Sequence, residues 1–242
     1  MPPCCPVVEL RRYRTHPGRR DELIALFDRE FVETQEAVGM RVIGQFRDLD
    51  DPDAFVWLRG FADMEQRRRA LEAFYFGPVW QAHREAANAT MADSDDVLLL
   101  KPGGAASGFD LPAARPAVGA TEAGPGVLSL TTLRLADEDQ AWLAQAFERD
   151  LAPILAAHGA QPLAWFVGEH AQNTFPRLPV REGEYGLAWV SAFPDAAAHA
   201  ASAAALGGSV EWRDAWARIA PRLAQPAQIQ RLQPTARSLL RG

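Results

Sequence analysis

The segment VVELRRYR (residues 7–14) decides the fold, because it returns 120 positions later as VLSLTTLR (residues 127–134). The same offset relates Leu10, Arg14, Leu23, Phe27, Arg29 and Gly39 to Leu130, Arg134, Leu143, Phe147, Arg149 and Gly159. Farther along, an offset of 132 relates Trp57, Phe61, Asp63, Trp80 and Pro102 to Trp189, Phe193, Asp195, Trp212 and Pro234. Constant offsets across such different residue types predict a tandem duplication of a unit of about 100 residues.

The change of offset from 120 to 132 places a 12-residue insertion in the second copy, between Gly159 and Trp189. Within that interval, residues 170–184 (HAQNTFPRLPVREGE) are longer than the few residues of a usual hairpin connection. Three roles are open for this loop: a lid over a cavity, an arm that reaches another subunit, or a mobile segment.

The duplication predicts a first unit at residues 1–102 and a second unit at residues 127–242. Between them, residues 103–126 are mostly Gly, Ala and Pro with few large apolar side chains. This composition is typical of a linker, and the segment is long enough to let the two units pair.

Apolar spacing and turn residues predict the same order of elements in both units. In the first unit we expect a strand at 7–14, a helix from Arg19 to Gly39, strands at 40–47 and 54–61, a helix after Asp63 that is interrupted at Gly77-Pro78, and a strand at 96–101. In the second unit we expect a strand at 127–135, a helix at 137–157, strands near 161–168 and 185–193, a helix broken at Gly207-Gly208, and a strand near 227–233. The order β-α-β-β-α-β is the ferredoxin-like arrangement.

The helices of such a unit cover one face of its sheet, and the other face needs a cover because an open apolar sheet invites association. Two units in one chain can cover each other, with their sheets packed face to face or curled into a joint barrel. The sequence therefore predicts an α+β fold in which two tandem ferredoxin-like units pair as a dimeric α/β-barrel-type pseudo-dimer, with a cavity between the sheets.

Composition excludes several classes of protein. The net charge of −6 argues against a general nucleic-acid-binding protein, since phosphate binding needs a basic surface. Abundant Ala and Arg, with Lys101 as the only lysine, are typical of a high-GC genome. We expect a bacterial source. The start MPPCCPVVELRR lacks the pattern of a signal peptide, and Val97–Leu100 is too short to span a bilayer. We expect a cytoplasmic protein with no membrane contact.

The sequence predicts neither a cofactor nor a metal. Cys4 and Cys5 are the only cysteines, and adjacent cysteines bond to each other only with strain, so we expect no disulfide framework. Paired histidines at metal-ligand spacing, phosphate-binding Gly-rich loops and nucleophile motifs are all missing from the sequence. The purified protein should be colourless and free of metal.

The run Glu9-Leu10-Arg11-Arg12-Tyr13-Arg14, followed by His16-Pro17-Gly18, resembles the opening of the NIPSNAP family. The strand around Trp57, the Arg-rich helix after it and Gly77-Pro78-Val79-Trp80 are also similar to that family. The resemblance extends over both units and is closer in the first. It implies the dimeric α/β-barrel superfamily, which includes cofactor-independent oxygenases, haem-degrading enzymes, isomerases and ligand-binding regulators.

Strand alternation groups the polar residues of the first unit. Glu9, Arg11 and Tyr13 share one face of the first strand, and Leu10 points the other way. Because Leu10 recurs as Leu130, we expect it on the helix-covered face, which leaves the other three residues facing the space between the sheets. On the third strand, Phe55, Trp57, Arg59 and Phe61 also share a face.

Two interpretations of this cluster are open. In the first, Arg11 or Arg59 holds a carboxylate or enolate oxygen and Tyr13 donates a hydrogen bond in a mostly aromatic pocket. In the second, Glu9 pairs with Arg11 or Arg59 and the cluster only satisfies itself. The candidate ligand-binding residues are Glu9, Arg11, Tyr13, Phe46, Trp57, Arg59, Phe76, Trp80 and His83.

Two of these candidates have specific alternatives. His83 follows Trp80 by three residues, a spacing loosely similar to the haem-degrading branch, but an exposed or capping histidine has the same pattern. Phe76, beside the break at Gly77, either gates the pocket or packs in the core. No residue is assigned a catalytic role.

The sequence thus predicts a NIPSNAP-like protein that binds a small, partly apolar organic molecule, with cofactor-independent oxygenase or isomerase chemistry in reach. The alternative is a non-enzymatic interaction or scaffold module, and a homo-oligomer is compatible with both. In the second unit Glu9, Arg11, Tyr13 and Arg59 become Ser129, Thr131, Leu133 and Ser191. We therefore expect the first unit to carry the pocket and the second to close it.

Overall fold

A computed structural model describes residues 4–241; residues 1–3, at the start of the expected first unit, lie outside that range. Over the described residues, eight strands form one closed antiparallel barrel in the order β1-β3-β2-β8-β5-β7-β6-β4. Their bounds are β1 (Val7–Thr15), β2 (Arg41–Asp48), β3 (Ala54–Phe61), β4 (Met91–Pro102), β5 (Val127–Arg134), β6 (Pro162–Gly168), β7 (Gly186–Phe193) and β8 (Gln228–Pro234). The fold is α+β, as predicted.

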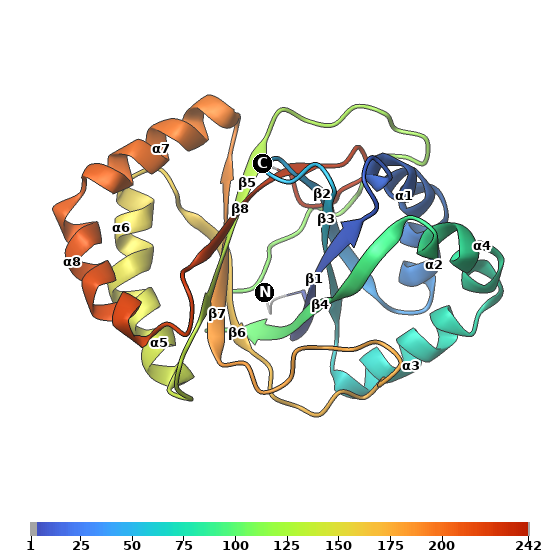
Figure 1. Cartoon of the computed structure of the whole chain (residues 1–242), viewed down its shortest axis with the longest axis horizontal. Coiled ribbons are helices and arrows are strands. Elements are labelled where there is room, and N and C mark those ends of the chain that lie inside the picture. Colours follow the sequence, from blue (N-terminus) through green and yellow to red (C-terminus); the bar gives the residue numbers. More distant parts are fainter. Residues whose placement is uncertain (1–3, 242) are drawn as a thin grey trace.

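Helices cover the outside of the barrel on two opposite sides (Figure 1). One group comprises α1 (Arg20–Leu26), η1 (Phe27–Phe31), α2 (Val32–Ala37), α3 (Met64–Tyr75) and α4 (Pro78–Asn88). The other comprises α5 (Gln140–Ala146), η2 (Phe147–Leu151), α6 (Ala152–Ala157), α7 (Ala196–Gly208), α8 (Val210–Ile219) and η3 (Ala220–Arg222). None of the helices in residues 4–241 has both the length and the apolar character needed to cross a membrane.

Two seams between the halves of the chain close the barrel. At one seam β2 pairs with β8, for example Phe46 with Pro234; at the other β4 pairs with β6, for example Leu100 with Gly168. Of the two arrangements that the sequence allowed, the structure therefore has the joint barrel.

Local sequence rules explain the starts and ends of several elements. The Asp63 carboxylate accepts a hydrogen bond from the Gln66 amide and so caps α3, and Pro78 occupies the first turn of α4. Gly39 has a φ of +95°, which other residues rarely adopt, just after the helix that precedes β2. β4 begins at Met91, five residues before the predicted strand, because its polar start pairs with the end of β1 without showing apolar alternation.

Residues related by the two sequence offsets occupy corresponding places in the two halves of the structure. Leu10 pairs with Leu58 across β1 and β3, and Leu130 pairs with Val190 across β5 and β7. The π-helical turn η1 begins at Phe27, and its counterpart η2 begins at Phe147. π-helical turns are rare, so their recurrence at an offset of 120 is a specific likeness between the halves.

The inside of the barrel is a packed apolar core. It is filled by side chains from all eight strands, among them Val8, Leu10, Phe46, Val56, Leu58, Leu128, Leu130, Phe166, Val190 and Leu232. Our expectation that Leu10 faces the helices is therefore wrong. The recurrence of Leu10 as Leu130 identifies a buried position, but in a barrel covered by helices both faces of each strand are buried.

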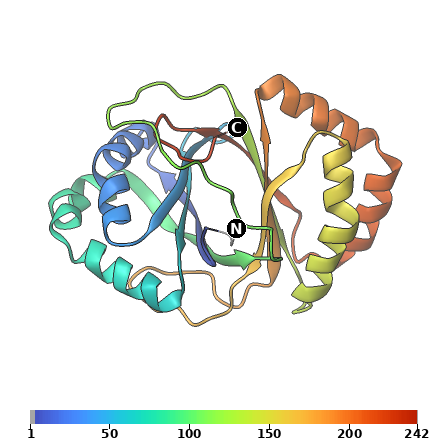
Figure 2. The same cartoon turned by 180° about the vertical axis from the view of Figure 1, so that it is seen from behind.

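The segment between the halves is more than a spacer. It runs along the side of the barrel near α1 and α2 (Figure 2), where Arg115 donates hydrogen bonds to Glu36 and to the Val42 carbonyl oxygen. Phe109 of this segment is 4% exposed and packs on Phe166 in the barrel core. The structure also bonds Cys4 to Cys5, contrary to our expectation for adjacent cysteines.

A tight contact between β5 and β7 predicts a stability effect. A Cβ atom at Gly186 would lie 2.1 Å from the Leu133 carbonyl oxygen, a main-chain atom that cannot turn away. We expect Gly186→Ala to lower the free energy of unfolding by about 1–3 kcal/mol, measured by urea denaturation. The matched control is Gly207→Ala in α7, where nothing lies within 4 Å, and which should leave stability unchanged or raised. Equal effects of the two substitutions would contradict this assignment.

Candidate functional site

The polar residues of the first strand lie between the barrel and the helices α1 to α4, not inside the barrel as we expected. Tyr13 and Trp57 pack in one cluster with helix residues such as Phe27 and Phe74. Glu9, which pairs with Arg59 across β1 and β3, has the same alternation as Tyr13 and is fully buried. The sequence grouped these residues correctly but placed the group on the wrong face.

Glu9 is the centre of a buried ion-pair network. Its Oε2 accepts hydrogen bonds from Arg11 Nη1 at 2.8 Å and from Arg59 Nε at 2.7 Å. Its Oε1 accepts a third from Arg67 Nε at 2.7 Å. Burial would raise the pKa of Glu9, but the three guanidinium groups together hold it well below its usual range.

Arg67 is a member of this network that the sequence analysis missed. It belongs to the run Arg67-Arg68-Arg69, which looks like a solvated face, yet Arg67 has an exposed fraction of 0%. The signal that could have found it is helical spacing: Arg67 lies on the same face of α3 as Ala70, Leu71 and Phe74, which are all buried.

Positive charge exceeds negative charge in this network. Three arginines face one carboxylate, which leaves two positive charges without a counter-ion inside the network. Among the described residues, Arg59 Nη2 and Arg67 Nη2 have no hydrogen-bond partner. Aromatic faces supply part of the compensation, since the Arg59 guanidinium lies 5.0 Å from the centre of the Trp57 ring.

Tyr13 is held so that its hydroxyl hydrogen remains available. Arg11 Nε donates a hydrogen bond to the Tyr13 hydroxyl oxygen at 2.8 Å. Burial raises the pKa of Tyr13, against the opposing effect of Arg11, so the phenol is protonated at neutral pH. The hydroxyl can therefore accept from Arg11 and still donate its own hydrogen elsewhere.

A small aromatic cavity adjoins Tyr13. Its volume is about 30 Å³, which is room for about one water molecule. The walls are Tyr13, Leu23, Phe27, Phe31, Gln35, Trp57, Phe74, Tyr75, Trp80, Ala87 and Met91. The indole Nε1 of Trp57 is buried and has no acceptor within the described part of the chain. Over residues 4–241, the Trp57 N–H has no acceptor and the Tyr13 hydroxyl accepts a hydrogen bond but donates none, and both residues belong to the walls of one cavity.

The first half of the chain matches the model of the NIPSNAP family over residues 8–102. These residues form a NIPSNAP domain. No curated protein matches the chain.

Solved structures resemble the chain at two levels. An anthrone oxidase-like protein is 15% identical, with a TM-score of 0.61, over 95% of this chain and 91% of its own. A protein from Fusobacterium nucleatum named as a putative monooxygenase is 9% identical, with a TM-score of 0.59, over 98% of this chain and 96% of its own. A NIPSNAP-like domain protein from Burkholderia xenovorans is 30% identical, with a TM-score of 0.37, over 40% of this chain and 84% of its own. The two full-length likenesses show that the barrel fold is shared.

Six of the nine predicted ligand-binding residues do not line the cavity of the NIPSNAP domain. Glu9, Arg11 and Arg59 belong to the ion-pair network instead. Phe46 points into the barrel core, because it pairs with Val56 on the face opposite to Trp57. Phe76 is 56% exposed at the break between α3 and α4. His83 on α4 is partly buried, with Nε2 3.6 Å from a Glu30 carboxylate oxygen and its ring 6.4 Å from that of Phe31.

The insertion of the second half packs on the NIPSNAP domain of the same chain. In Figure 1 it runs from the ends of β6 and β7 to α3. Arg67 Nη1 donates to Asn173 Oδ1 at 3.0 Å and to the Thr174 hydroxyl at 3.2 Å. Phe175 is 5% exposed and stacks on Tyr75 with ring centres 5.8 Å apart. The loop therefore contacts both the charged network and a residue of the cavity wall.

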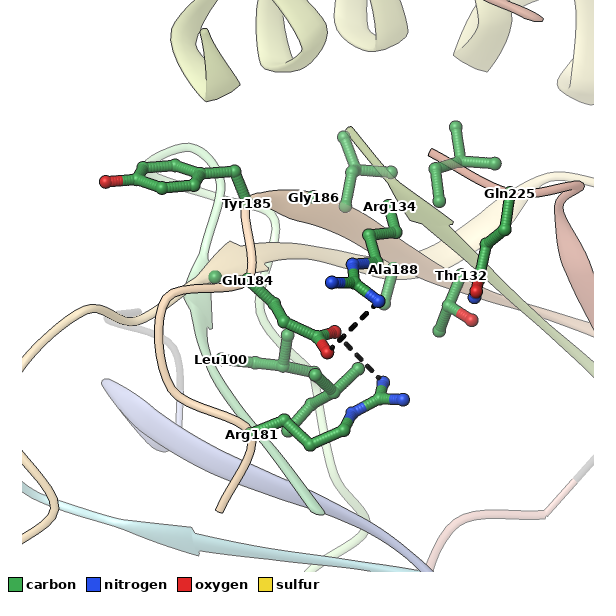
Figure 3. A pocket seen from close by; sticks show the side chains of 13 residues that line it. Leu100, Thr132, Arg134, Arg181, Glu184, Tyr185, Gly186, Ala188 and Gln225 are labelled. Atoms are coloured by element: carbon green, nitrogen blue, oxygen red, sulfur yellow. Dashed lines mark ion pairs between the residues drawn. The ribbon is translucent and has the colours of Figure 1, made fainter. Parts of the chain in front are cut away.

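A second cavity of about 30 Å³ lies beside β5, β7 and the base of the insertion (Figure 3), and it shares no lining residue with the aromatic cavity. Glu184 stands between Arg134 and Arg181, with ion-pair distances of 3.6 and 3.4 Å. Two arginines thus share one carboxylate, and Arg181 also pairs with Asp96 at 3.4 Å. Among the described residues, the buried Nε of Arg181 has no hydrogen-bond partner. Within residues 4–241, no three His, Cys, Asp or Glu side chains lie close enough together to hold a metal ion.

Proposed function

We propose that the NIPSNAP domain binds a small, mostly aromatic molecule that carries a hydrogen-bond-accepting oxygen. The observation that supports this most is the pair of donors, Tyr13 O–H and Trp57 Nε1–H, on the walls of one aromatic cavity. A buried donor without an acceptor costs about 1–3 kcal/mol, and a ligand oxygen recovers that free energy. Aromatic walls with a few polar groups are typical of small-molecule sites.

The charge excess behind the cavity favours a ligand that becomes anionic. Gln35 is a wall residue of the cavity, and its side-chain oxygen accepts a hydrogen bond from Arg59 at 3.0 Å. Positive charge at this distance lowers the pKa of a bound phenol or enol and stabilises the resulting oxyanion. We propose cofactor-independent oxygenase or isomerase chemistry on such an anion, in line with the names of the two full-length structural relatives.

We further infer that the chain is a tandem of two ferredoxin-like units, at residues 1–102 and 127–242, paired as a pseudo-dimer. In the second unit, Ser191 stands where Arg59 would be, and its hydroxyl donates to the Ala160 carbonyl oxygen at 2.7 Å. A charged residue of the first unit is thus replaced by a small residue whose hydroxyl makes its hydrogen bond within the second unit. This supports a working pocket in the first unit and a closing role for the second.

The alternative of an interaction or scaffold module needs a continuous apolar surface. Within residues 4–241, the exposed large apolar residues are Leu49, Phe76, Val118, Leu163, Val210 and Ile229, and they belong to six separate segments of the chain. Single exposed apolar residues of this kind are ordinary on a protein surface. We therefore retain small-molecule binding as the proposed function.

Binding of 1-naphthol, a two-ring phenol, tests this proposal. We expect Tyr13→Phe and Trp57→Phe each to weaken binding about 10-fold, since each removes one hydrogen bond of about 1.4 kcal/mol. Tyr13→Phe keeps the aromatic wall, whereas Trp57→Phe also replaces the indole by a smaller ring. Titration by quenching of tryptophan fluorescence measures the affinity for Tyr13→Phe, and calorimetry does so for both variants. The matched control is Thr131→Val in the second unit, which should bind like the parent. Parental affinity in both aromatic variants would show that these donors do not hold the ligand.

A further inference from the structure

The aromatic cavity is too small for the ligand that its walls favour. A volume of about 30 Å³ admits about one water molecule, whereas an aromatic ring needs several times that space. A wall of the cavity must therefore move before a ring can enter. The wall that moves should contain a side chain that rests against a segment able to move away.

Most wall residues are fixed by regular structure. Tyr13 and Trp57 belong to the central strands β1 and β3 of the barrel, and Phe27 and Phe31 belong to η1, packed against those strands. Each of these four side chains is at most 8% exposed. Interiors of this kind are close-packed and do not part easily.

Three wall residues, Tyr75, Trp80 and Met91, are only partly buried. Among them, Tyr75 is backed by the insertion. It is the last residue of α3, directly before the break at Gly77, and it is only half-buried. Phe175 of the insertion stacks on it with an angle of 26° between the rings, and Phe175 also contacts Phe76 edge to face at 6.2 Å. The backing of this wall residue is thus an irregular loop.

Side chains hold the tip of this loop in place. The Thr174 hydroxyl donates to the Met64 carbonyl oxygen at 3.1 Å and accepts from Arg67, as the Asn173 side-chain oxygen does. Arg67 in turn binds Glu9, so the loop is tied to the charged network behind the cavity. At the base of the loop, Gly183 has a φ of +70°, a conformation in which glycine can turn with little cost.

We propose that residues 173–178 are a gate over the aromatic cavity and that Phe175 is its specificity-determining residue. Phe175 leaves Tyr75 to admit a ligand, and its size sets the largest aromatic molecule that fits beneath the closed gate. The identity of the ligand rests on the proposed function, whereas the existence of the gate does not. In this proposal, the second half of the chain supplies a moving part of the binding site in the first half.

Exchange of the Trp57 indole hydrogen with deuterium tests the gate without any ligand. That hydrogen belongs to a buried nitrogen of a cavity-wall residue, so its exchange requires water to enter the cavity. We expect Phe175→Ala to accelerate this exchange at least about 10-fold, followed by NMR of the full chain labelled with nitrogen-15. Thr174→Val, which keeps the loop packing but loses both hydrogen bonds of the hydroxyl, should accelerate it less.

The matched control is Phe109→Ala, which removes an equally buried phenylalanine from the barrel core, away from the cavity. It should leave the exchange of the Trp57 indole hydrogen unchanged, apart from any acceleration shared by every slow amide. If Phe175→Ala and Phe109→Ala have the same effect on Trp57 relative to those amides, the gate proposal is overturned.

Ligand size tests the specificity role. The parent should bind 1-naphthol in preference to the three-ring phenol 9-phenanthrol, and Phe175→Ala should shift that ratio about 10-fold toward the larger compound. An unchanged ratio in a variant that binds both compounds would overturn the role of Phe175. Failure of the parent to bind either phenol would count against the proposed function, and the exchange of the Trp57 hydrogen would still decide whether the gate exists.

Discussion

Glu9→Gln should lower the free energy of unfolding by about 3–5 kcal/mol, the usual cost of removing one partner from a buried ion pair. Glutamine has the shape of the lost glutamate but no charge, so Arg11, Arg59 and Arg67 would face one another without a counter-ion. All three are at most 1% exposed, and water cannot screen them. Urea denaturation at neutral pH measures the loss.

The effect of Glu9 should also depend on pH. The pKa of Glu9 in the folded protein lies well below its ordinary value of 4.5. Its contribution to the free energy of unfolding is therefore complete above about pH 4.5 and is lost as the pH falls toward the folded pKa. Each pH unit in this window reduces the contribution by about 1.4 kcal/mol. The parent and Glu9→Gln should therefore approach each other in stability as the pH is lowered from about 5 to about 3.

A surface carboxylate provides the control for Glu9. Glu65 on α3 pairs with Arg68 and Arg69, all three at the surface. Solvent screens such pairs, so Glu65→Gln should change stability little. Equal losses for Glu65→Gln and Glu9→Gln would mean that the buried network has no special role in stability.

The first unit by itself should not persist as a folded monomer. Separation of residues 1–102 from the rest removes the partners of β2 and β4 and uncovers the inner face of the barrel. Full burial of an aliphatic side chain contributes about 1.5–3 kcal/mol, so exposure of Val8, Leu10, Val56 and Leu58 costs an amount comparable with the whole stability of a domain.

We expect residues 1–102 to form a symmetric dimer that closes a barrel with its own second copy, or else to aggregate. Light scattering after size-exclusion chromatography would give twice the mass of the fragment. Mixing with residues 103–242, which include Phe109 of the barrel core, should restore a one-to-one complex, which serves as the control for correct folding. A folded, monomeric fragment at micromolar concentration would contradict the interdependence of the two halves.

The order of the elements was predictable because it depends on local patterns. Asp63 as the cap of α3 and Gly39 in the left-handed region follow from short-range chemistry that needs no knowledge of the rest of the fold. The grouping of Glu9, Arg11 and Tyr13 on one face follows from the alternation of a strand in the same way.

The face to which that group belongs was not predictable by the same means. Alternation shows which residues lie together, and burial of both faces removes the usual contrast between an apolar inside and a polar outside. Phe46 shows the consequence: it is as apolar as Trp57 and equally buried, yet it belongs to the barrel core, on the other side of the sheet.

Contacts between residues far apart in the sequence could not be predicted, for a different reason. Arg67 and Asn173 are 106 positions apart, and nothing in either segment specifies the other. The insertion was visible as a change of offset, but its contact with α3 depends on how the closed barrel brings the end of β6 near that helix. Arg67 itself could have been found from the helical spacing of α3.

The asymmetry of the insertion has a consequence for how such a protein can evolve. In a dimer of identical chains, any change to a loop appears at both sites at once, so a loop cannot improve one site without altering the other. Here a single chain supplies both halves of the barrel, and the loop of residues 170–184 contacts α3 of the opposite half. On the function proposed above, mutations in that loop are free to adapt the site of the first half while the second half is selected for keeping the barrel closed.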